Sequence, residues 1–566
     1  MKQRIRIQNK DKTARIFRPA ASFAELVEHM REHGGKTAFM WNAASEDGID
    51  GTVNYELLTE RITAVAAALS ARGLASAHVG FVGAPSVAYM AAMLGVLLAG
   101  GVIVPLDREH TTERAATLLR RAKVKALFFG AGITADGVKL GAKRSLCCDM
   151  TDTADGESAI SFSALLEEGR AAIAAGYTPP AVPEERLAAL LFTSGTVGER
   201  KCAMLTAGAL LAGVNAACAS VELEKSDLVL SALPFHHPFT FSSLFVIFNY
   251  GATVAINDEP KNLVANMKKY RPTAMFLVPL YISALYNRLW DDNKQMNHAR
   301  GLHLGIRTSN VFLNFGIDLR DKLFSHTRSF FGGRLRTVIS GGAPLNPKLI
   351  YAFESLGISV YEGYGITECG PFVSVTPYYA RRVGSVGKPL PGVSVRIDGE
   401  GVRSEHGYEE GEIEVKGAGV MQGYLDEEHN DLVFTLDGYF RTGDVGYLDR
   451  DGYLYVTGRK KSVIVLDNGR NVAPEELEEY LLSIPEVEDA LVSGKKDEAG
   501  IVRLHAALFP KADARAERGE EEMLALLHER VEELNRRLPL FKRMHEVSLS
   551  PEPFPRNASG KLIRTL

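Results

Sequence analysis

Residues 79–106, VGFVGAPSVAYMAAMLGVLLAGGVIVPL, contain the pattern that decides the fold class. An apolar run, VGFVGA, is followed by a helical stretch from Ser86 to Leu98, a Gly-Gly turn and a second apolar run, VIVPL. Two short apolar strands joined by a helix favour a parallel pair, because a parallel connection needs the crossover that a helix supplies. The stretch therefore predicts an α/β unit.

The same alternation continues on both sides of this stretch. Asn54 is a candidate N-cap for a helix that ends near Gly73, and a charged helix is expected from Thr111 to Lys123. Further apolar strands are predicted at 227–232, 252–256, 274–278 and 335–340. Strands that alternate with helices indicate an α/β fold, so we expect a large N-terminal domain with doubly wound, mixed or parallel sheets.

The texture of the chain changes after about residue 380. Short alternating runs such as VSVRID, GEIEVKG and GYLYVTG predict a small β-barrel-like subdomain. The pattern then becomes α+β and ends with an amphipathic helix over roughly 521–538. We therefore expect domains at 1–458 and 459–566, the second being a small α+β lid.

Composition and charge narrow the class of protein. The chain has 566 residues and a net charge of −4, a near balance that argues against a nucleic-acid-binding role. Three long uncharged runs (81–106, 202–221 and 228–256) are interrupted by Pro, Gly, His or Asn, which favours a buried core over a membrane span. Five cysteines without CxxC spacing and an N-terminus without an apolar signal segment favour a cytoplasmic location.

The sharpest local motif is LLFTSGTVGERKCAML. An apolar strand runs into a loop that starts at Thr193 and ends at Lys201. Between them the loop contains Ser194, Gly195, Thr196 and Gly198. Backbone N–H groups of such a loop, with a Lys beside them, form a phosphate-binding nest. A flexible turn is the other reading of this motif alone.

Four further motifs carry candidate ligands. The turn after the predicted strand RTVIS contains Gly342, Ala343 and Pro344, where small residues let a flat base approach the backbone. YEGYGITECG offers the ring of Tyr364, the hydroxyl of Thr367 and the carboxylate of Glu368, a candidate magnesium ligand. In the fourth and fifth motifs, FRTGD to GRKK and the C-terminal SGK, the candidates are Asp444, Arg459 and Lys561. Taken singly, these four motifs have other readings: a plain Gly-rich turn, a capped turn with a surface Glu, a hairpin with a surface ion pair, and a solvated terminal Lys.

In order and spacing, the five motifs together resemble those of the adenylate-forming superfamily, which includes acyl-CoA synthetases and luciferases. The resemblance implies a two-step ligase that uses ATP, Mg²⁺ and CoA: a carboxylate and ATP give an acyl-adenylate, and a thiol then displaces AMP. It implies that the loop from Thr193 to Lys201 holds the β- and γ-phosphates. Tyr364 would stack on adenine beside Gly342, Ala343 and Pro344.

The resemblance also assigns the remaining residues. Thr367 would bind the α-phosphate, Glu368 the magnesium ion and Asp444 the ribose, with Arg459 as an ATP contact. Lys561 would bridge the substrate carboxylate and the α-phosphate. Lys461 corresponds to the hinge of a mobile C-terminal domain, and Gly469 to the loop that lines the thiol tunnel.

The segment LPFHHPFTFS resembles the acyl-pocket motif of bacterial long-chain fatty-acid–CoA ligases, with His237 at the position of the family's histidine. Five apolar side chains are weaker candidates for the pocket wall: Phe235, Phe239, Phe241, Leu244 and Phe248. The phosphate loop departs from the family at Val197, Arg200 and Cys202. A long-chain fatty acid and CoA are therefore the expected substrates. Two alternative functions stay open: the chain loads an acyl carrier protein in place of CoA, or it is a non-catalytic relative that binds a nucleotide. Peripheral contact with the inner membrane face also stays open.

Overall fold

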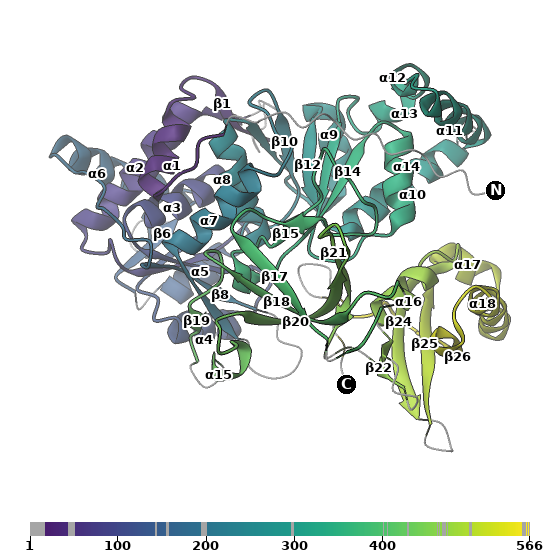
Figure 1. The fold of residues 1–566 in the computed structure, drawn as a ribbon. Helices are drawn as coiled ribbons and strands as arrows, with labels where there is room; N and C mark the ends of the chain where they lie inside the picture. The colour runs from purple at the N-terminus through teal and green to yellow at the C-terminus, as the bar shows by residue number, and fades with distance from the viewer. Residues whose placement is uncertain are drawn as a thin grey trace. The chain divides into compact units, whose positions relative to one another are not determined.

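The computed structural model describes most of the chain, in two compact units. The described residues are 17–42, 51–141, 144–153, 158–193, 201–295, 299–399, 401–404, 406–426, 430–460, 462, 464–466, 471–472, 474–496, 501–556, 562 and 564. Unit 1 comprises residues 1–394 and 415–440, and unit 2 comprises 395–414 and 441–566. Figure 1 labels the elements of both units.

The larger sheet of unit 1, sheet A, has nine strands in the order β16-β15-β14-β13-β12-β10-β11-β1-β2. The strands from β14 to β1 are parallel, and antiparallel strands close both edges. In that order the bounds are Lys388–Pro389, Ser374–Val375, Ser359–Tyr364, Thr337–Ser340, Ala274–Leu277, Leu228–Ser231, Thr253–Ile256, Thr37–Trp41 and Gly51–Asn54. Because the inner strands are parallel, their carboxyl ends meet at one edge of the sheet.

The second sheet of unit 1, sheet B, has eight strands in the order β19-β9-β8-β4-β3-β5-β6-β7. The strands from β8 to β7 are parallel, whereas β9 and β19 are antiparallel additions at one edge. In that order the bounds are Gly423–Tyr424, Cys202–Thr206, Leu187–Phe192, Val102–Leu106, His78–Val82, Ala126–Phe129, Leu146–Asp149 and Ile160–Ser161. The predicted doubly wound, mixed fold of the large domain is confirmed.

Helices cover both sheets, and α7 and α8 pack against each other between sheet B and sheet A (Figure 1). The helices of unit 1 are α1 Phe23–Arg31, α2 Tyr55–Ala71, α3 Val87–Leu98, α4 Thr112–Arg121, α5 Thr134–Gly141, α6 Phe162–Ala174, α7 Ala207–Cys218, α8 Pro238–Tyr250, α9 Leu263–Tyr270, α10 Pro279–Gln295, α11 Ala299–Asn314, α12 Arg320–Leu323, α13 Ser325–Ser329, α14 Pro347–Ser355 and α15 Asn430–Val433. The helices α2 and α3 approach closely at Gly95, where a Cβ atom would lie 2.6 Å from the Cβ of Val65.

Unit 2 contains the C-terminal part of the chain. A four-stranded sheet, β17-β18-β20-β21, belongs largely to it, and a three-stranded sheet, β24-β25-β26, packs against α16 and α18. The strands are β17 Val393–Asp398, β18 Glu410–Gly417, β20 Phe440–Leu448, β21 Leu454–Arg459, β22 Ile464–Val465, β23 Asn471–Val472, β24 Val487–Lys496, β25 Val502–Pro510 and β26 Met544–Leu549, and the helices are α16 Pro474–Leu481, α17 Ala512–Glu517 and α18 Glu520–Asn535.

The local predictions can be compared element by element. Asn54, Ser86 and Thr111 each cap a helix through a side-chain oxygen that accepts a hydrogen bond from a backbone N–H of the first turn, the role for which Ser, Thr and Asn are favoured. The three uncharged runs are strands and helices of unit 1 whose side chains are largely buried. No helix in the described part of the chain combines the length and apolar character that a bilayer crossing requires.

The division into compact units differs from the predicted boundary after residue 458. The four-stranded sheet, predicted as a subdomain of the large domain, is grouped mainly with the C-terminal residues. The domains at 1–458 and 459–566 and the hinge near Lys461 therefore stay predictions.

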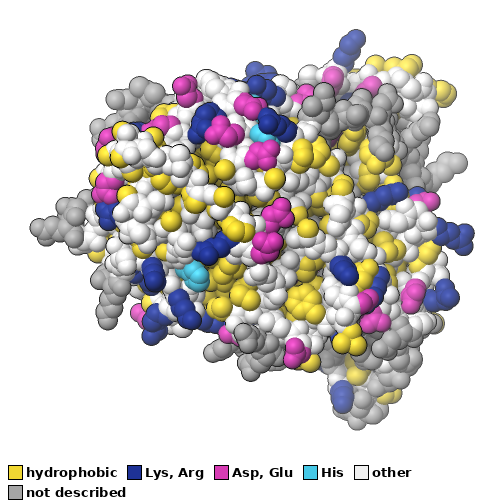
Figure 2. Space-filling view, turned by 60° about the vertical axis from the view of Figure 1, so that its left-hand side comes forward, with side chains coloured by type: hydrophobic (Ala, Val, Ile, Leu, Met, Phe, Trp, Pro, Cys, Tyr) yellow, Lys and Arg dark blue, Asp and Glu magenta, His cyan; other side chains and the backbone are white. Residues whose placement is uncertain are grey.

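Figure 2 shows that basic and acidic side chains are interspersed on one face of the molecule.

Candidate active site

The predicted phosphate loop connects β8 to β9, two antiparallel strands of sheet B. Phe192 pairs with Cys202, and beyond this pair the backbone N–H of Thr193 donates to the carbonyl oxygen of Lys201 at 2.9 Å. Thr193 and Lys201 thus close the base of the loop. Ser194, Gly195, Thr196 and Gly198, with the departures at Val197 and Arg200, lie outside the described residues.

A chain of three side chains links Lys201 to the predicted magnesium ligand. The ammonium of Lys201 lies over the ring of Tyr424, 4.6 Å from its centroid. The hydroxyl of Tyr424 donates to Oε1 of Glu368 at 2.8 Å. Tyr424 is held there because β19 pairs with β9, with Tyr424 opposite Ala203. Tyr424 thus places a cation of the loop and the carboxylate of Glu368 in one neighbourhood.

The predicted adenine-binding residues follow two adjacent parallel strands of sheet A. Ser340 of β13 pairs with Glu362 of β14, so Gly342 and Tyr364 each come two residues later, at the same edge of the sheet. Gly342 has a φ of 86°, a left-handed conformation that suits glycine and turns the chain sharply. Ala343 and Pro344 follow in exposed positions, so a flat ligand can reach this turn.

Thr367 and Glu368 lie in a single 3-10 turn, Thr367–Cys369, just beyond β14. The backbone N–H of Met421 donates to the carbonyl oxygen of Glu368 at 2.8 Å, which fixes the turn against the segment before β19. The side chain of Glu368 is half-buried. A single accessible carboxylate suits Mg²⁺ that takes its other ligands from phosphate and water. The described residues contain no cluster of three or more His, Cys, Asp or Glu that would form an all-protein metal site.

A second contact joins the carboxyl-end edges of the two sheets. His236, which follows β10 of sheet A, has its Nε2 3.9 Å from Oδ2 of Asp107, which follows β4 of sheet B. The neighbouring His237, the residue singled out from the sequence, caps α8, and its Nδ1 accepts the N–H of Phe239 at 3.3 Å. His237 therefore positions the start of α8, next to the turn at Gly341.

Most of the predicted acyl-pocket side chains lie in the packed interior. Phe248 meets the rings of Phe39 and Tyr55, and Phe235 meets the ring of Tyr89. Phe235, Phe241, Leu244 and Phe248 are all 0–1% exposed. Phe239 differs because it is half-buried and lies beside Gly341, whose added Cβ would be 3.2 Å from its ring. Its ring meets those of Phe276 and Phe372, so an aromatic cluster adjoins the Gly342 turn.

Cys202, which follows Lys201, is a buried thiol. Its side chain is 0% exposed, and burial raises its pKa to about 12. The thiolate is the reactive form of cysteine, so this pKa makes Cys202 unreactive at neutral pH. It contributes to packing at the base of the loop.

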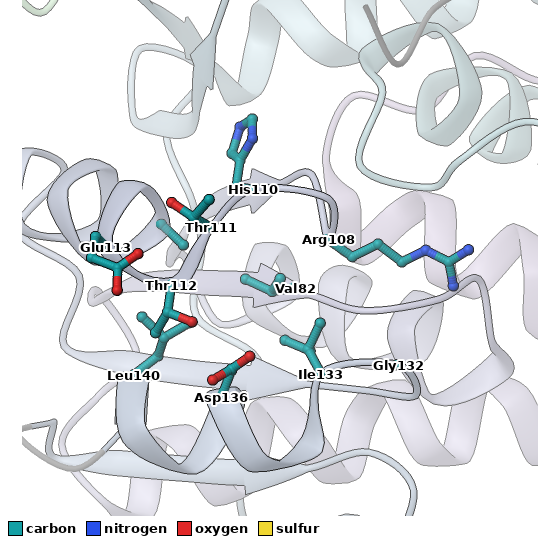
Figure 3. Close-up of a pocket in the computed structure, with 11 residues that line it drawn as sticks. Val82, Arg108, His110, Thr111, Thr112, Glu113, Gly132, Ile133, Asp136 and Leu140 are labelled. Atoms are coloured by element: carbon teal, nitrogen blue, oxygen red, sulfur yellow. The ribbon is translucent and has the colours of Figure 1, made fainter.

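A pocket of about 290 Å³ opens at the carboxyl-end edge of sheet B (Figure 3). It is lined by Val82, Arg108, His110, Thr111, Thr112, Glu113, Ala115, Gly132, Ile133, Asp136 and Leu140. These residues come from strand ends and the segments that follow them, and from the helices α4 and α5, as Figure 3 shows. Because β4 is adjacent to β8, the pocket and the loop that begins at Thr193 share one sheet edge.

Two predicted site residues, Asp444 and Arg459, belong to unit 2. They face each other across the β20–β21 pair, and Nε of Arg459 lies 3.0 Å from Oδ1 of Asp444. Asp444 is only 4% exposed, whereas the side chain of Arg459 is 44% exposed, so the pair joins a buried carboxylate to a partly exposed guanidinium in a hairpin. Its backbone N–H donates to Oγ1 of Thr442 at 3.1 Å.

The chain on either side of Lys561 is anchored within unit 2. Arg556 forms an ion pair with Asp489, and Arg564 lies 2.8 Å from Oε2 of Glu478. A backbone bridge also joins Arg556 to Leu562. Lys561, like Lys461 and Gly469, lies outside the described residues, so the roles implied for these three stay predictions.

Tyr424 and Asp107 are the site residues that sequence reasoning missed. Tyr424 lies in the segment MQGYL, whose small and apolar residues indicate only a strand. Its link to Lys201 becomes visible only through the pairing of β19 with β9, and the link from His236 to Asp107 only through the packing of two sheets.

Comparison with known proteins finds CoA ligases among the relatives of this chain. A long-chain-fatty-acid–CoA ligase of Mycobacterium bovis is 30% identical over 417 residues, which cover 70% of this chain and 68% of that protein. A 2-succinylbenzoate–CoA ligase of Bacillus licheniformis is 32% identical over 382 residues, 67% of this chain and 69% of that protein. Relatives with different named acids thus match to a similar extent.

Solved structures share the fold. ATP-bound MatB from Rhodopseudomonas palustris has a TM-score of 0.70 at 24% identity and covers 95% of this chain and 97% of that chain. The o-succinylbenzoate CoA synthetase of Bacillus subtilis, in complex with its acyl-adenylate, has a TM-score of 0.71 at 22% identity, with 97% and 98% covered. The AMP-binding enzyme family model matches residues 26–425, and the model of the AMP-binding enzyme C-terminal domain matches 461–566. With both models matched and the five motifs in order, the chain belongs to the AMP-binding enzyme family, the adenylate-forming enzymes.

Proposed function

We propose that the protein activates a fatty acid with ATP and then transfers the acyl group to CoA. In the first step a carboxylate oxygen attacks the α-phosphorus of ATP, and the bond to the bridging oxygen of pyrophosphate breaks. In the second step the CoA thiol attacks the acyl carbon, loses its proton, and AMP leaves. The products are acyl-CoA, AMP and pyrophosphate.

The observation that carries this proposal is the chain Lys201–Tyr424–Glu368. Tyr424 positions together an ammonium at the base of the phosphate loop and a carboxylate that accepts a hydrogen bond from its hydroxyl. A nucleotide triphosphate needs both, because its phosphates bind cations directly and bind carboxylates only through a metal ion. Mg²⁺ held at Glu368 would supply positive charge to the phosphate oxygens.

The protein's own groups have to offset the repulsion between two anions, the carboxylate and the triphosphate. Lys201 contributes one positive charge at the loop, and Lys561 is proposed to contribute a second between the carboxylate and the α-phosphate. Loss of one preorganised group of this kind typically costs about 3–4 kcal/mol, or about 10²–10³ in rate. Thr367 would donate its hydroxyl to an α-phosphate oxygen, and Asp444 would accept hydrogen bonds from the ribose.

An apolar acid is favoured by the surroundings of the Gly342 turn. The half-buried ring of Phe239 meets Phe276 and Phe372, so the side chains around it are aromatic. A dicarboxylate such as 2-succinylbenzoate needs a cation for its second carboxylate, whereas an alkyl chain gains about 0.8 kcal/mol for each methylene that it buries against such rings. A long-chain fatty acid is therefore the proposed substrate.

CoA is the proposed acceptor, and the pocket beside α4 and α5 is the proposed place for its nucleotide. The pocket has a volume of about 290 Å³, and its lining contains one Arg, Arg108, together with the carboxylates Glu113 and Asp136. The pocket begins one strand away from the phosphate loop, so about 5–15 Å separates them along the sheet edge. An extended pantetheine arm spans that distance. A carrier protein would dock on a surface and has no need of such a pocket.

The decisive experiment is a panel of acids from octanoic to octadecanoic, with 2-succinylbenzoate and anthranilate as comparison acids. AMP release is measured with ATP, Mg²⁺ and either CoA or acyl carrier protein. The proposal expects AMP release that rises with chain length and requires CoA. Preferred use of either aromatic acid would contradict the substrate, preferred use of the carrier would contradict the acceptor, and no acid-dependent exchange of pyrophosphate into ATP would favour the non-catalytic reading.

The role proposed for Lys561 is tested separately. Lys561→Ala is expected to lower the ATP–pyrophosphate exchange rate at least about 10²-fold, while thioester formation from supplied acyl-adenylate continues. Arg108→Glu is the matched variant for the second half-reaction: it should raise the KM for CoA and leave exchange unchanged. An unimpaired exchange rate in Lys561→Ala would remove this residue from the mechanism.

A further inference from the structure

One corner of unit 1 presents an exposed apolar surface. Large apolar side chains that are exposed among the described residues concentrate between 304 and 323, and the most exposed of them are Phe315 at 79% and Leu304 at 67%. The other members are Val311, Phe312, Ile317 and Leu323. We name these six residues the α11 patch. Figure 1 shows α11, α12 and α13 together at this corner.

The patch lies on the outer side of a helix whose inner side is already packed. Leu302, Ser309 and Leu313 are buried on the inner side of α11. Leu304 and Val311, at a spacing of seven residues, share the opposite side. A helix with apolar residues on both sides has one side without a partner within the unit, and an exposed apolar patch of this kind marks an interaction surface.

The patch is held firmly at its C-terminal end. The N–H groups of Gly316 and Ile317 donate to the carbonyl oxygens of Leu313 and Phe312, at 3.0 Å each, and Gly316 adopts a φ of 81°. This is a helix-ending turn that fixes Phe315 and Ile317 at the tip of α11. The patch therefore needs no rearrangement to meet a partner.

The sequence segment that contains the patch is rich in cations, although two of them, Lys261 and Arg336, pair with Glu259 and Asp227 outside it. Residues 260–353 contain 14 Lys and Arg, only four Asp and no Glu, whereas the whole chain has a net charge of −4. Two of the four Asp are neutralised locally, because Asp318 pairs with Arg320 and Asp321 pairs with Arg328.

Other cations near the patch face outward. The side chains of Arg307, Lys322 and Arg334 are exposed. Arg307 lies on α11 itself, three residues after Leu304, and Lys322 immediately precedes Leu323. Apolar tips are thus mixed with cationic ones, which is the composition of a helix that lies at a membrane interface.

We propose that the α11 patch docks on the surface of an anionic lipid bilayer. The apolar tips of Leu304 and Phe315 enter the boundary between headgroups and acyl chains, while Arg307 and Lys322 contact the anionic headgroups. A second copy of this chain is a poorer partner. A symmetric dimer through the patch would place the same cations against one another. This inference concerns where the protein acts and does not depend on which acid it activates.

The test is flotation of the full chain with vesicles of phosphatidylcholine containing phosphatidylglycerol, compared with pure phosphatidylcholine. Wild type is expected to float with the anionic vesicles, less with the neutral ones, and less in high salt because salt screens the charges. The double variant Leu304→Ser/Phe315→Ser should weaken binding about tenfold or more, given the apolar area lost. Arg307→Glu/Lys322→Glu should also weaken binding about tenfold or more, given about 1 kcal/mol per cation at such surfaces.

Matched controls make the result specific. Leu436→Ser/Leu540→Ser removes two strongly exposed apolar side chains outside the patch, and Arg450→Glu/Lys496→Glu reverses two exposed charges outside it. Both controls should float like wild type. The conservative variant Phe315→Trp should retain binding and shift its fluorescence to the blue on anionic vesicles. Thermal melting of each variant confirms that it is folded.

Three outcomes would overturn the proposal. The first is equal flotation of the patch variants and wild type, and the second is no flotation of folded wild type with anionic vesicles. The third is a dimer in sedimentation velocity without lipid that Leu304→Ser/Phe315→Ser converts to monomer. That result would assign the α11 patch to self-association.

Discussion

Tyr424 is the residue on which the geometry of the candidate site depends. Its ring supports the ammonium of Lys201 and its hydroxyl donates to Glu368, so one side chain positions two oppositely charged groups. Each of these two groups, the ammonium of Lys201 and the carboxylate of Glu368, contacts Tyr424. Tyr424 is therefore a positioning residue, and its ring and its hydroxyl can be tested apart.

Tyr424→Phe removes the hydroxyl and retains the ring. A hydrogen bond to a charged group contributes about 1.5–3 kcal/mol, so the rate of ATP–pyrophosphate exchange should fall about 10- to 100-fold. The Mg²⁺ concentration needed for half-maximal exchange should rise, because Glu368 loses the hydrogen-bond donor that orients its carboxylate. Tyr439→Phe, which removes a hydroxyl that meets Oγ of Ser394, is the control. Exchange that is unchanged in Tyr424→Phe would show that Glu368 is oriented by other contacts.

Lys36 makes the stability of the fold depend on pH. Burial, with Lys225 nearby, lowers the pKa of Lys36 from 10.5 to about 8, and its ammonium donates to the carbonyl oxygens of Lys225 and Gly251. Between about pH 8 and 10.5 the unfolded chain binds a proton that the folded chain does not, so the free energy of unfolding gains a term that increases with pH. Urea unfolding between about pH 8 and 10.5 should show that the free energy of unfolding increases with pH more in wild type than in Lys36→Met. The same pH dependence in both proteins would contradict this account.

At the scale of elements, Gly95 shows how two helices fix each other. A Cβ atom at this position would lie 2.6 Å from Cβ of Val65 and 2.9 Å from the carbonyl oxygen of Ile62. Gly95→Ala should therefore destabilise the protein by about 1–3 kcal/mol, because α2 and α3 must separate. Gly301→Ala in α11, where nothing lies within 4 Å, is the control and should leave stability unchanged or slightly higher. Equal unfolding midpoints for the two variants would contradict this account.

The elements were largely predictable from the sequence because their signals are local. Asn54, Ser86 and Thr111 are capping residues followed by apolar periodicity, and each begins a helix as predicted. The predicted C-terminal helix was too long, because α18 ends at Asn535 while the apolar pattern continues to Leu538. The exposed apolar side of α11 could not be predicted from the sequence. Apolar residues lie on both sides of this helix, so they do not form the single stripe that helical periodicity detects.

The candidate site was predictable only in part, for a physical reason. Tyr364 ends β14, Gly342, Thr367 and Glu368 follow strand ends, and parallel strands bring such residues to one edge. Tyr424 is 56 residues from Glu368, and His236 is far from Asp107 in sequence, so their contacts depend on strand order and on the packing of two sheets. Sequence periodicity does not encode either of these.

At the scale of the whole molecule, the proposed reaction needs residues from both compact units. Lys201, Tyr364 and Glu368 belong to unit 1, whereas Asp444 and Lys561 belong to unit 2. The two half-reactions are proposed to use different arrangements, with Lys561 serving the first and Gly469 the second. Lys461 is the proposed hinge.

Lys461→Pro tests that proposal, because proline fixes φ near −65° and so restricts a hinge. We expect the variant to retain ATP–pyrophosphate exchange and to lose thioester formation by at least about tenfold. Lys461→Ala, which removes the charge but leaves φ free, should retain both half-reactions. Equal loss of both half-reactions in Lys461→Pro would contradict a hinge at this position.

The uneven distribution of charge has a consequence for how the molecule approaches its surroundings. With 14 cations in residues 260–353 and a total of −4, the rest of the chain carries a clear excess of negative charge, so cations are concentrated in the segment that contains the α11 patch. Near an anionic bilayer the field attracts this segment within about one Debye length of roughly 10 Å. This attraction orients the protein as it diffuses toward the bilayer. The α11 patch therefore faces the lipid when the two meet.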